Sequence, residues 1–120
     1  MNQSTLVLGA STNPSRYANM ALHRLVDRGI PAQALGLKAG EVAGVIIETD
    51  PNRISKPDTI TLYVGPKNQS HYTDLLLNLA PRRVIFNPGT ENSALEKALE
   101  EEGIEVLRAC TLVLLATNQY

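Results

Sequence analysis

The sequence has 120 residues, 43% of them hydrophobic, and its 11 Lys and Arg residues nearly balance its 12 Asp and Glu residues. This length suits one domain, residues 1–120, with enough apolar side chains for a hydrophobic core. The balanced charge argues against a nucleic-acid surface, and the low aromatic content (four Tyr, one Phe, no Trp) argues against a base-stacking platform.

The cysteine count and the hydropathy of the chain bear on its compartment. One cysteine excludes an internal disulfide and fits a reducing cytosol. Residues Met1–Thr5 lack the basic segment and the apolar segment with which a signal peptide begins. No apolar stretch approaches the roughly 20 residues that span a bilayer. We therefore expect a cytoplasmic protein without a membrane partner.

The chain opens with a predicted strand, turn and helix. The apolar run Leu6–Leu8 breaks at Gly9 into a polar turn that contains Asn13-Pro14. Apolar residues at helical spacing over 18–26 predict a helix. A second strand over 32–37 completes a β-α-β unit, whose crossover is expected to be right-handed.

The rest of the chain alternates strands and helices. Residues 38–57 show no helical periodicity, so we expect a loop there, with a possible short edge strand at Val45–Glu48. A capping box at Ser93–Glu96 predicts the start of a helix. The apolar patterns predict three further strands, over 59–64, 84–86 and 104–107, two helical faces, over 72–79 and 93–99, and an apolar tail over 111–116.

This alternation predicts the fold class. Strands that alternate with helices are typical of a three-layer α/β fold with a parallel sheet. The sequence therefore predicts a Rossmann-like, doubly wound, parallel sheet of five strands in the order 3-2-1-4-5.

The first turn is a candidate phosphate site, because ligands of such sheets bind outside the carboxyl ends of the strands. It reads Gly9-x-Ser11-x-x-Pro14-x-Arg16, which differs from the Gly-x-Gly-x-x-Gly dinucleotide fingerprint. A strand that ends in glycine and leads into a helix is a common way to bind phosphate. Ser11 offers a hydroxyl and Arg16 a charged fork. In the alternative interpretation, Gly9 only turns the chain and Arg16 is solvated.

The end of the second strand narrows the choice of nucleotide. A protein that binds NAD usually has Asp or Glu there, whereas this chain has Gly36-Leu37-Lys38 and no carboxylate before Glu41. A cation at this point suits a ligand with a phosphate on its ribose, and NADP and coenzyme A both have one. In the alternative interpretation, Lys38 is a surface loop residue.

Three segments resemble, in order, a known family. They are Gly-Ala-Ser-x-Asn-Pro-x-Arg-Tyr at residues 9–17, Asn87–Asn92 and Gly103–Val113. They are similar to the small CoA-binding-domain proteins, single-domain relatives of the CoA-binding domain of succinyl-CoA synthetase α subunits. The resemblance implies a Rossmann-type fold with CoA or acyl-CoA along the carboxyl ends of the strands. It implies a site formed by four loops: Gly9, Ala10, Ser11, Asn13, Pro14 and Arg16; Leu37 and Lys38; Val64 and Gly65; Asn87, Pro88 and Gly89.

Candidate catalytic residues are few. Cys110 follows the last strand and is better interpreted as a small buried residue than as a nucleophile, although Arg108 and a helix N-terminus would favour its thiolate. His23 and His71 lie in predicted helices and are expected at the surface. Glu91 is expected to stabilise the first turn of a helix. No spacing indicates a metal cluster or a Ser-His-Asp set.

We therefore interpret the protein as a stand-alone CoA or acyl-CoA binding protein without catalytic residues of its own. The first alternative is a small NADP-binding, oxidoreductase-like protein. The second is an interaction protein with a vestigial pocket, in which the apolar segment Leu112–Ala116 forms the seam of a homodimer. Burial of this segment against the sheet is the favoured alternative to such a seam.

Overall fold

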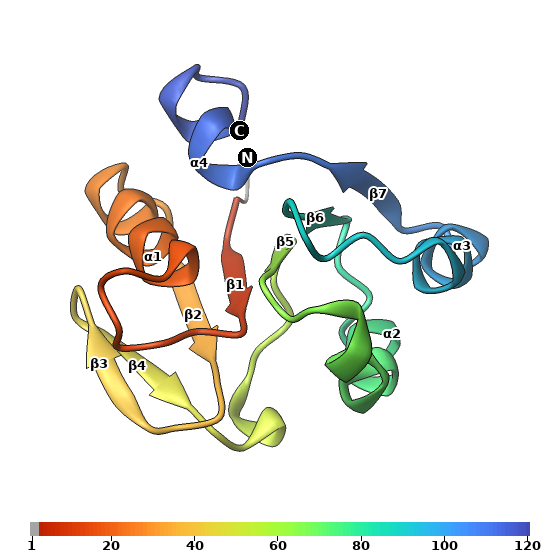
Figure 1. Cartoon of the computed structure of the whole chain (residues 1–120), viewed down its shortest axis with the longest axis horizontal. Helices are drawn as coiled ribbons and strands as arrows, with labels where there is room; N and C mark the ends of the chain where they lie inside the picture. The colour runs from red at the N-terminus through yellow and green to blue at the C-terminus, as the bar shows by residue number, and fades with distance from the viewer. Residues whose placement is uncertain (1–2) are drawn as a thin grey trace.

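The strand β1 (Thr5–Leu8) lies at the centre of the sheet in the computed structural model, which describes residues 3–120 (Figure 1). All four of its residues are buried, as expected for a parallel strand covered on both faces. Leu6 and Leu8 face one hydrophobic cluster and Val7 faces the other, because successive side chains of a strand point to opposite faces. Met1 and Asn2, which belong to the predicted domain, lie outside the described residues.

The sheet has seven strands in the order β3-β4-β2-β1-β5-β6-β7. Every neighbouring pair is parallel except β3 and β4, which are antiparallel. The strands other than β1 are β2 (Ala32–Leu35), β3 (Gly40–Val42), β4 (Val45–Glu48), β5 (Thr59–Leu62), β6 (Arg83–Phe86) and β7 (Glu105–Arg108). The predicted α/β class with a mostly parallel sheet is confirmed.

The predicted five strands and their order 3-2-1-4-5 are wrong. The segment expected to be a loop contains a hairpin, in which β4 pairs with β2 and β3 forms the edge of the sheet. The two residues between these strands, Ala43 and Gly44, have φ angles of 53° and 81°. Positive φ at both central residues is typical of a tight hairpin turn. Ala-Gly is a weak sequence signal for such a turn, so the edge strand β3 was not predicted.

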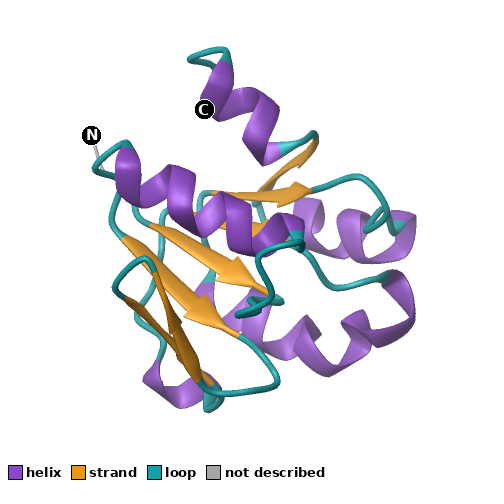
Figure 2. Cartoon of the chain, turned by 60° about the vertical axis from the view of Figure 1, so that its left-hand side comes forward, coloured by secondary structure: helices purple, strands orange, loops and turns teal. Residues whose placement is uncertain are grey.

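Helices cover both faces of the sheet (Figures 1 and 2). The four α-helices are α1 (Tyr17–Asp27), α2 (Thr73–Leu79), α3 (Ser93–Glu101) and α4 (Thr111–Ala116), and 3-10 helices span Pro51–Arg53 and Pro66–Tyr72. Residues of α1 and α4 pack with Val7, whereas residues of α2 and α3 pack with Leu6 and Leu8. These contacts give the three layers that the alternation predicts.

The apolar tail is the helix α4. Thr111 and Leu115, four residues apart, are buried against the rest of the molecule, and Leu115 packs in the same cluster as Leu22 and Leu25 of α1. The Arg28 guanidinium also donates a hydrogen bond of 2.6 Å to the Leu115 carbonyl oxygen. α4 therefore extends the helical layer that α1 begins.

The capping box of α3 begins one residue earlier than predicted. Asn92 is the N-cap: its side-chain oxygen accepts a hydrogen bond of 3.2 Å from the Leu95 amide. Glu96 accepts a hydrogen bond of 2.8 Å from the Asn92 amide in return. The Glu96 carboxylate also pairs with the Arg108 guanidinium at 2.8 Å, and this contact lowers the pKa of Glu96.

We expect Ala80→Gly to stabilise the protein. Ala80 ends α2 in the left-handed conformation, with φ 45° and ψ 57°, which strains an alanine but suits a glycine. The free energy of unfolding should rise by about 0.5–1 kcal/mol, measured by urea denaturation. The same change at Ala98, inside α3, is the matched control and should lower the free energy of unfolding by about 1 kcal/mol. Equal losses in both variants would contradict the strain assigned to Ala80.

Candidate functional site

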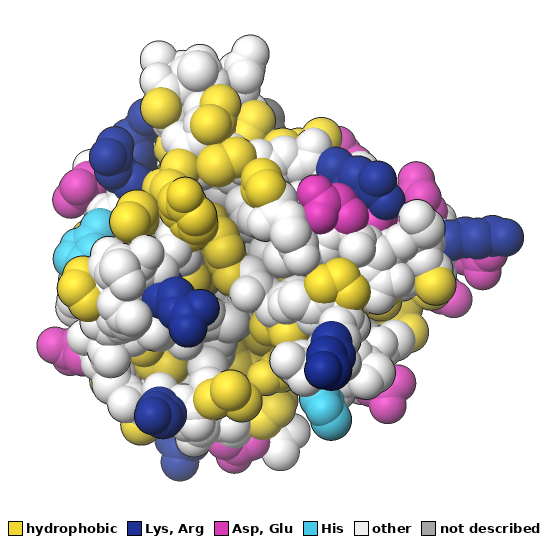
Figure 3. Space-filling view, viewed as in Figure 1, with side chains coloured by type: hydrophobic (Ala, Val, Ile, Leu, Met, Phe, Trp, Pro, Cys, Tyr) yellow, Lys and Arg dark blue, Asp and Glu magenta, His cyan; other side chains and the backbone are white. Residues whose placement is uncertain are grey.

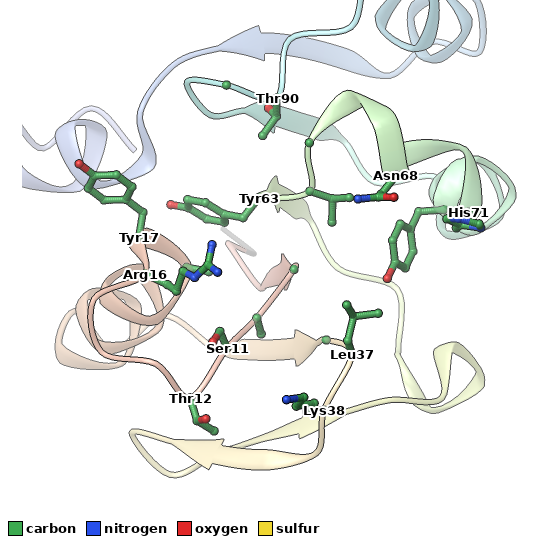
Figure 4. Close-up of a pocket in the computed structure, with 18 of the residues that line it drawn as sticks. Ser11, Thr12, Arg16, Tyr17, Leu37, Lys38, Tyr63, Asn68, His71 and Thr90 are labelled. Atoms are coloured by element: carbon green, nitrogen blue, oxygen red, sulfur yellow. The ribbon is translucent and has the colours of Figure 1, made fainter.

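A cavity of about 830 Å³ opens at the carboxyl ends of the central strands (Figure 4). Its wall is formed by the loops after β1, β2, β5 and β6 and by the N-terminal residues of α1. This is the edge of the sheet at which ligands of doubly wound folds bind.

The predicted site residues fall into two groups. Ten of them line the cavity: Gly9, Ala10, Ser11, Arg16, Leu37, Lys38, Val64, Gly65, Pro88 and Gly89. Asn13, Pro14 and Asn87 do not line it. Asn13 and Pro14 are exposed within the first loop, and Asn87 is buried behind the wall.

Two glycines allow the loop after β1 to approach the loops after β2 and β5 closely. A Cβ on Gly36 would lie 2.4 Å from the Ala10 carbonyl oxygen, which is closer than real contacts allow. Gly9 has φ 97°, and its Cβ would lie 3.0 Å from the Tyr63 carbonyl carbon. The amides of Gly9 and Ala10 both donate to the Leu35 carbonyl oxygen, at 2.9 and 3.0 Å. The loop after β1 is therefore fixed between β2 and β5.

Internal hydrogen bonds shape the rest of the first loop. The Asn13 amide donates to the Ser11 hydroxyl at 3.1 Å, and the Ser15 amide donates to the Asn13 side chain at 3.0 Å. The buried Asn19 side chain donates to the Ser11 carbonyl oxygen at 3.0 Å and so ties the loop to α1. Asn13 thus stabilises the turn from outside the cavity.

The N-terminus of α1 faces the cavity without a side-chain cap. The N-cap residue, Arg16, is extended and makes no capping hydrogen bond, and the first turn contains no acidic residue. Among residues 3–120, the backbone amides of Tyr17 and Ala18, two residues that line the cavity, have no hydrogen-bond acceptor. Free amides and the helix dipole favour an anion at this position.

The charged side chains that line the cavity are positive. Arg16 and Lys38 line it, and no described lining residue is Asp or Glu. Figure 4 shows Lys38 on the loop after β2 and Arg16 at the start of α1, with Ser11 between them. The cavity therefore offers two separate positions for negative groups.

A buried network of hydrogen bonds stabilises the wall of the cavity formed by the loop after β6. The Asn87 amide group donates to the Thr61 hydroxyl at 2.8 Å and to the Leu62 carbonyl oxygen at 3.0 Å. Its side-chain oxygen accepts a hydrogen bond of 2.8 Å from the Thr111 amide, at the start of α4. The Thr90 hydroxyl donates to the Asn87 carbonyl oxygen at 2.7 Å. Asn87 thus positions the turn that contains Pro88 and Gly89.

A second polar side chain joins two of the loops. The buried Gln69 amide donates to the carbonyl oxygens of Val64 and Thr90, at 2.8 and 2.7 Å. Gln69 lies in the 3-10 helix Pro66–Tyr72, which the sequence did not separate from the following helix. This helix brings three further residues to the cavity: Asn68, His71 and Tyr72.

Six other lining residues were not among the predicted binding residues: Thr12, Tyr17, Ala18, Gly36, Tyr63 and Thr90. Tyr63 follows β5, and its position beyond the end of a strand was the available signal. Its hydroxyl is buried and has no hydrogen-bond partner among the described residues. Burial raises the pKa of Tyr63 to about 12, so the hydroxyl keeps its proton at neutral pH.

The candidate catalytic residues do not form a cluster. Cys110 is half-buried at the start of α4 and does not line the cavity, and Arg108 is paired with the Glu96 carboxylate. Glu91 accepts a hydrogen bond of 2.9 Å from the Gly89 amide. His71 is exposed, as expected, but lies at the cavity (Figure 4). Within residues 3–120, no group of His, Cys, Asp and Glu is arranged to hold a metal ion.

The comparison with protein families identifies the domain. Residues 3–116 match the family model described as a CoA binding domain. The chain belongs to this family. No curated protein matches the sequence. None of the helices in the described part of the CoA-binding domain has the length and apolar character that a membrane crossing requires.

Solved structures share the fold of this CoA-binding domain over nearly its whole length. A crystal structure described only as an uncharacterized protein is 44% identical, covers 100% of this chain and 99% of its own, and has a TM-score of 0.95. A Thermus thermophilus protein is 24% identical, with coverages of 99% and 91% and a TM-score of 0.87. The acetyl-coenzyme A synthetase 1 of Ca. Korarchaeum cryptofilum, described as dinucleotide forming, is 20% identical, with coverages of 89% and 25% and a TM-score of 0.71.

We expect Gly36→Ala to destabilise the domain. The new Cβ would overlap the Ala10 backbone, so the first two loops must separate. The loss in the free energy of unfolding should be about 2 kcal/mol or more, measured by urea denaturation. Gly65→Ala is the matched control, because its Cβ would meet nothing within 4 Å and its φ is −64°. The control should stay within about 0.5 kcal/mol of the wild type, and a similar loss in both would show that the loop contact is not tight.

Proposed function

We propose that the protein binds coenzyme A or an acyl-CoA in the cavity at the carboxyl ends of β1, β2, β5 and β6. The observation that carries this proposal is the pair of separated cations in the cavity, Arg16 at the N-terminus of α1 and Lys38 on the loop after β2. CoA has two separate phosphate groups, a diphosphate and a ribose 3′-phosphate. Membership of the CoA-binding domain family supports the same ligand.

The residues present fit the diphosphate at the start of α1. The Tyr17 and Ala18 amides lack acceptors, and the Arg16 guanidinium adds charge-assisted hydrogen bonds. Glycine at position 9 lets the loop lie against the Tyr63 backbone, so the loop is held beside this position. These groups would hold the diphosphate, and the thiol of CoA would carry the acyl group.

The 3′-phosphate suits Lys38. This residue follows β2, where proteins that bind NAD place a carboxylate, and no described lining residue supplies one. The same loop contributes Leu37, which is 88% exposed, and Tyr72 faces the cavity from the 3-10 helix. We assign Leu37 and Tyr72 to the adenosine end.

The proposal is tested by isothermal titration with CoA, dephospho-CoA and NADP. We expect CoA to bind and dephospho-CoA, which lacks the 3′-phosphate, to bind about tenfold more weakly, since a hydrogen-bonded ion pair contributes about 1.5–3 kcal/mol. Lys38→Gln should remove this difference, whereas Lys97→Gln, at an exposed position of α3, should keep it. Arg16→Gln should weaken both ligands.

Two outcomes would overturn parts of the proposal. If no saturable heat appears with CoA at millimolar concentration, the CoA site is wrong. If dephospho-CoA binds as tightly as CoA, the role of Lys38 is wrong. Tighter binding of NADP than of CoA would favour the oxidoreductase-like alternative, because NADP also carries a phosphate on its ribose.

A further inference from the structure

One end of the cavity is apolar. Figure 4 shows Lys38 and Tyr17 at opposite ends, with Ser11 and Arg16 between them. Beyond Arg16, the lining residues include Tyr17, Ala18 and Tyr63, and none of them is charged. The Tyr17 side chain is 67% exposed at the rim.

Hydrophobic side chains continue outside this end. In Figure 3 they gather from the central hollow across the N-terminal part of α1 and onto α4. The two helices are in contact, and Val113 of α4 is 54% exposed. Contiguous exposed apolar area beside a ligand cavity marks a surface that a ligand or a partner covers.

The position of the cations gives the ligand a direction. This step rests on the proposed function. If the 3′-phosphate lies at Lys38 and the diphosphate at Arg16, the arm of CoA that ends in sulfur leads away from Lys38, toward the end with Tyr17 and Tyr63. A group attached to that sulfur reaches the apolar surface.

We propose that this apolar end, formed by Tyr17, Ala18 and Tyr63 and continued by α4, receives the acyl chain of an acyl-CoA thioester. The absence of charged lining residues beyond Arg16, within residues 3–120, makes the chain an uncharged aliphatic one. The chain is several carbons long, because the hydrophobic surface continues from the cavity across α1 onto α4. The protein then binds such an acyl-CoA more tightly than free CoA.

The test compares acetyl-CoA with hexanoyl-CoA by isothermal titration on the full chain. Hexanoyl-CoA has four more methylene groups, and burying about half of their surface should raise the affinity about tenfold. In Tyr17→Ser this ratio should fall to about twofold, and in Tyr17→Phe it should remain about tenfold. Ile46→Ser is the control for loss of an exposed apolar side chain, because Ile46 is 61% exposed on β4 and does not line the cavity. Its ratio should equal that of the wild type.

Equal affinities for acetyl-CoA and hexanoyl-CoA in the wild type would overturn the acyl site while leaving the CoA site intact. Failure of CoA itself to bind would overturn the proposed function instead. A ratio that Tyr17→Ser leaves unchanged would place the chain elsewhere. Sedimentation of the wild type and the same variants tests whether this surface is instead a protein interface. If the wild type is a dimer and Tyr17→Ser is a monomer, the surface is a dimer interface and the proposal is overturned.

Discussion

The contact between the loops after β1 and β2 is the constraint on which the site depends. The Leu35 carbonyl oxygen accepts hydrogen bonds from the Gly9 and Ala10 amides, and the Ala10 carbonyl oxygen lies where a side chain on Gly36 would begin. This contact fixes the path of the chain into α1. Through it, the free amides at the start of α1 and the Lys38 side chain come to line one cavity. The absence of a Cβ at Gly9 and Gly36 therefore determines how the charged groups are placed around the cavity.

The sequence predicted the parts of the fold that local patterns determine. β1 was evident because Leu6–Leu8 form a continuous apolar run, and α1 because its apolar residues recur at helical spacing. The strand at Val45–Glu48 was predicted and is β4, but β3 and the hairpin turn were missed because Ala43 adopts positive φ without being glycine or asparagine. The 3-10 helix Pro66–Tyr72 was missed because 3-10 spacing over so short a segment leaves no distinct period.

The site residues that were predicted are also those that local sequence patterns indicate, and the residues that only the tertiary fold brings to the site were missed. The first turn was found because a strand, a glycine and a following helix lie close in sequence, and Lys38 because a cation stands after the second strand where a carboxylate is usual in proteins that bind NAD. His71 and Tyr72 were not assigned to the site because only the fold brings their helix over the ends of β1 and β2. Asn87 was assigned to the ligand from its place after a strand, but its three hydrogen bonds are spent within the protein. A residue's place in the chain indicated the correct edge of the sheet and not the direction of its side chain.

The helix α4 does not line the cavity, but Asn87 connects α4 to the cavity wall through hydrogen bonds. Its side-chain oxygen holds the first turn of α4 through the Thr111 amide, and its own carbonyl oxygen holds the cavity wall through Thr90. A local opening of α4 therefore releases the side chain that shapes the turn at Pro88. Ordering of that turn by a ligand acts in the opposite direction and slows the opening of α4. The end of the chain and the mouth of the cavity thus form one cooperative unit.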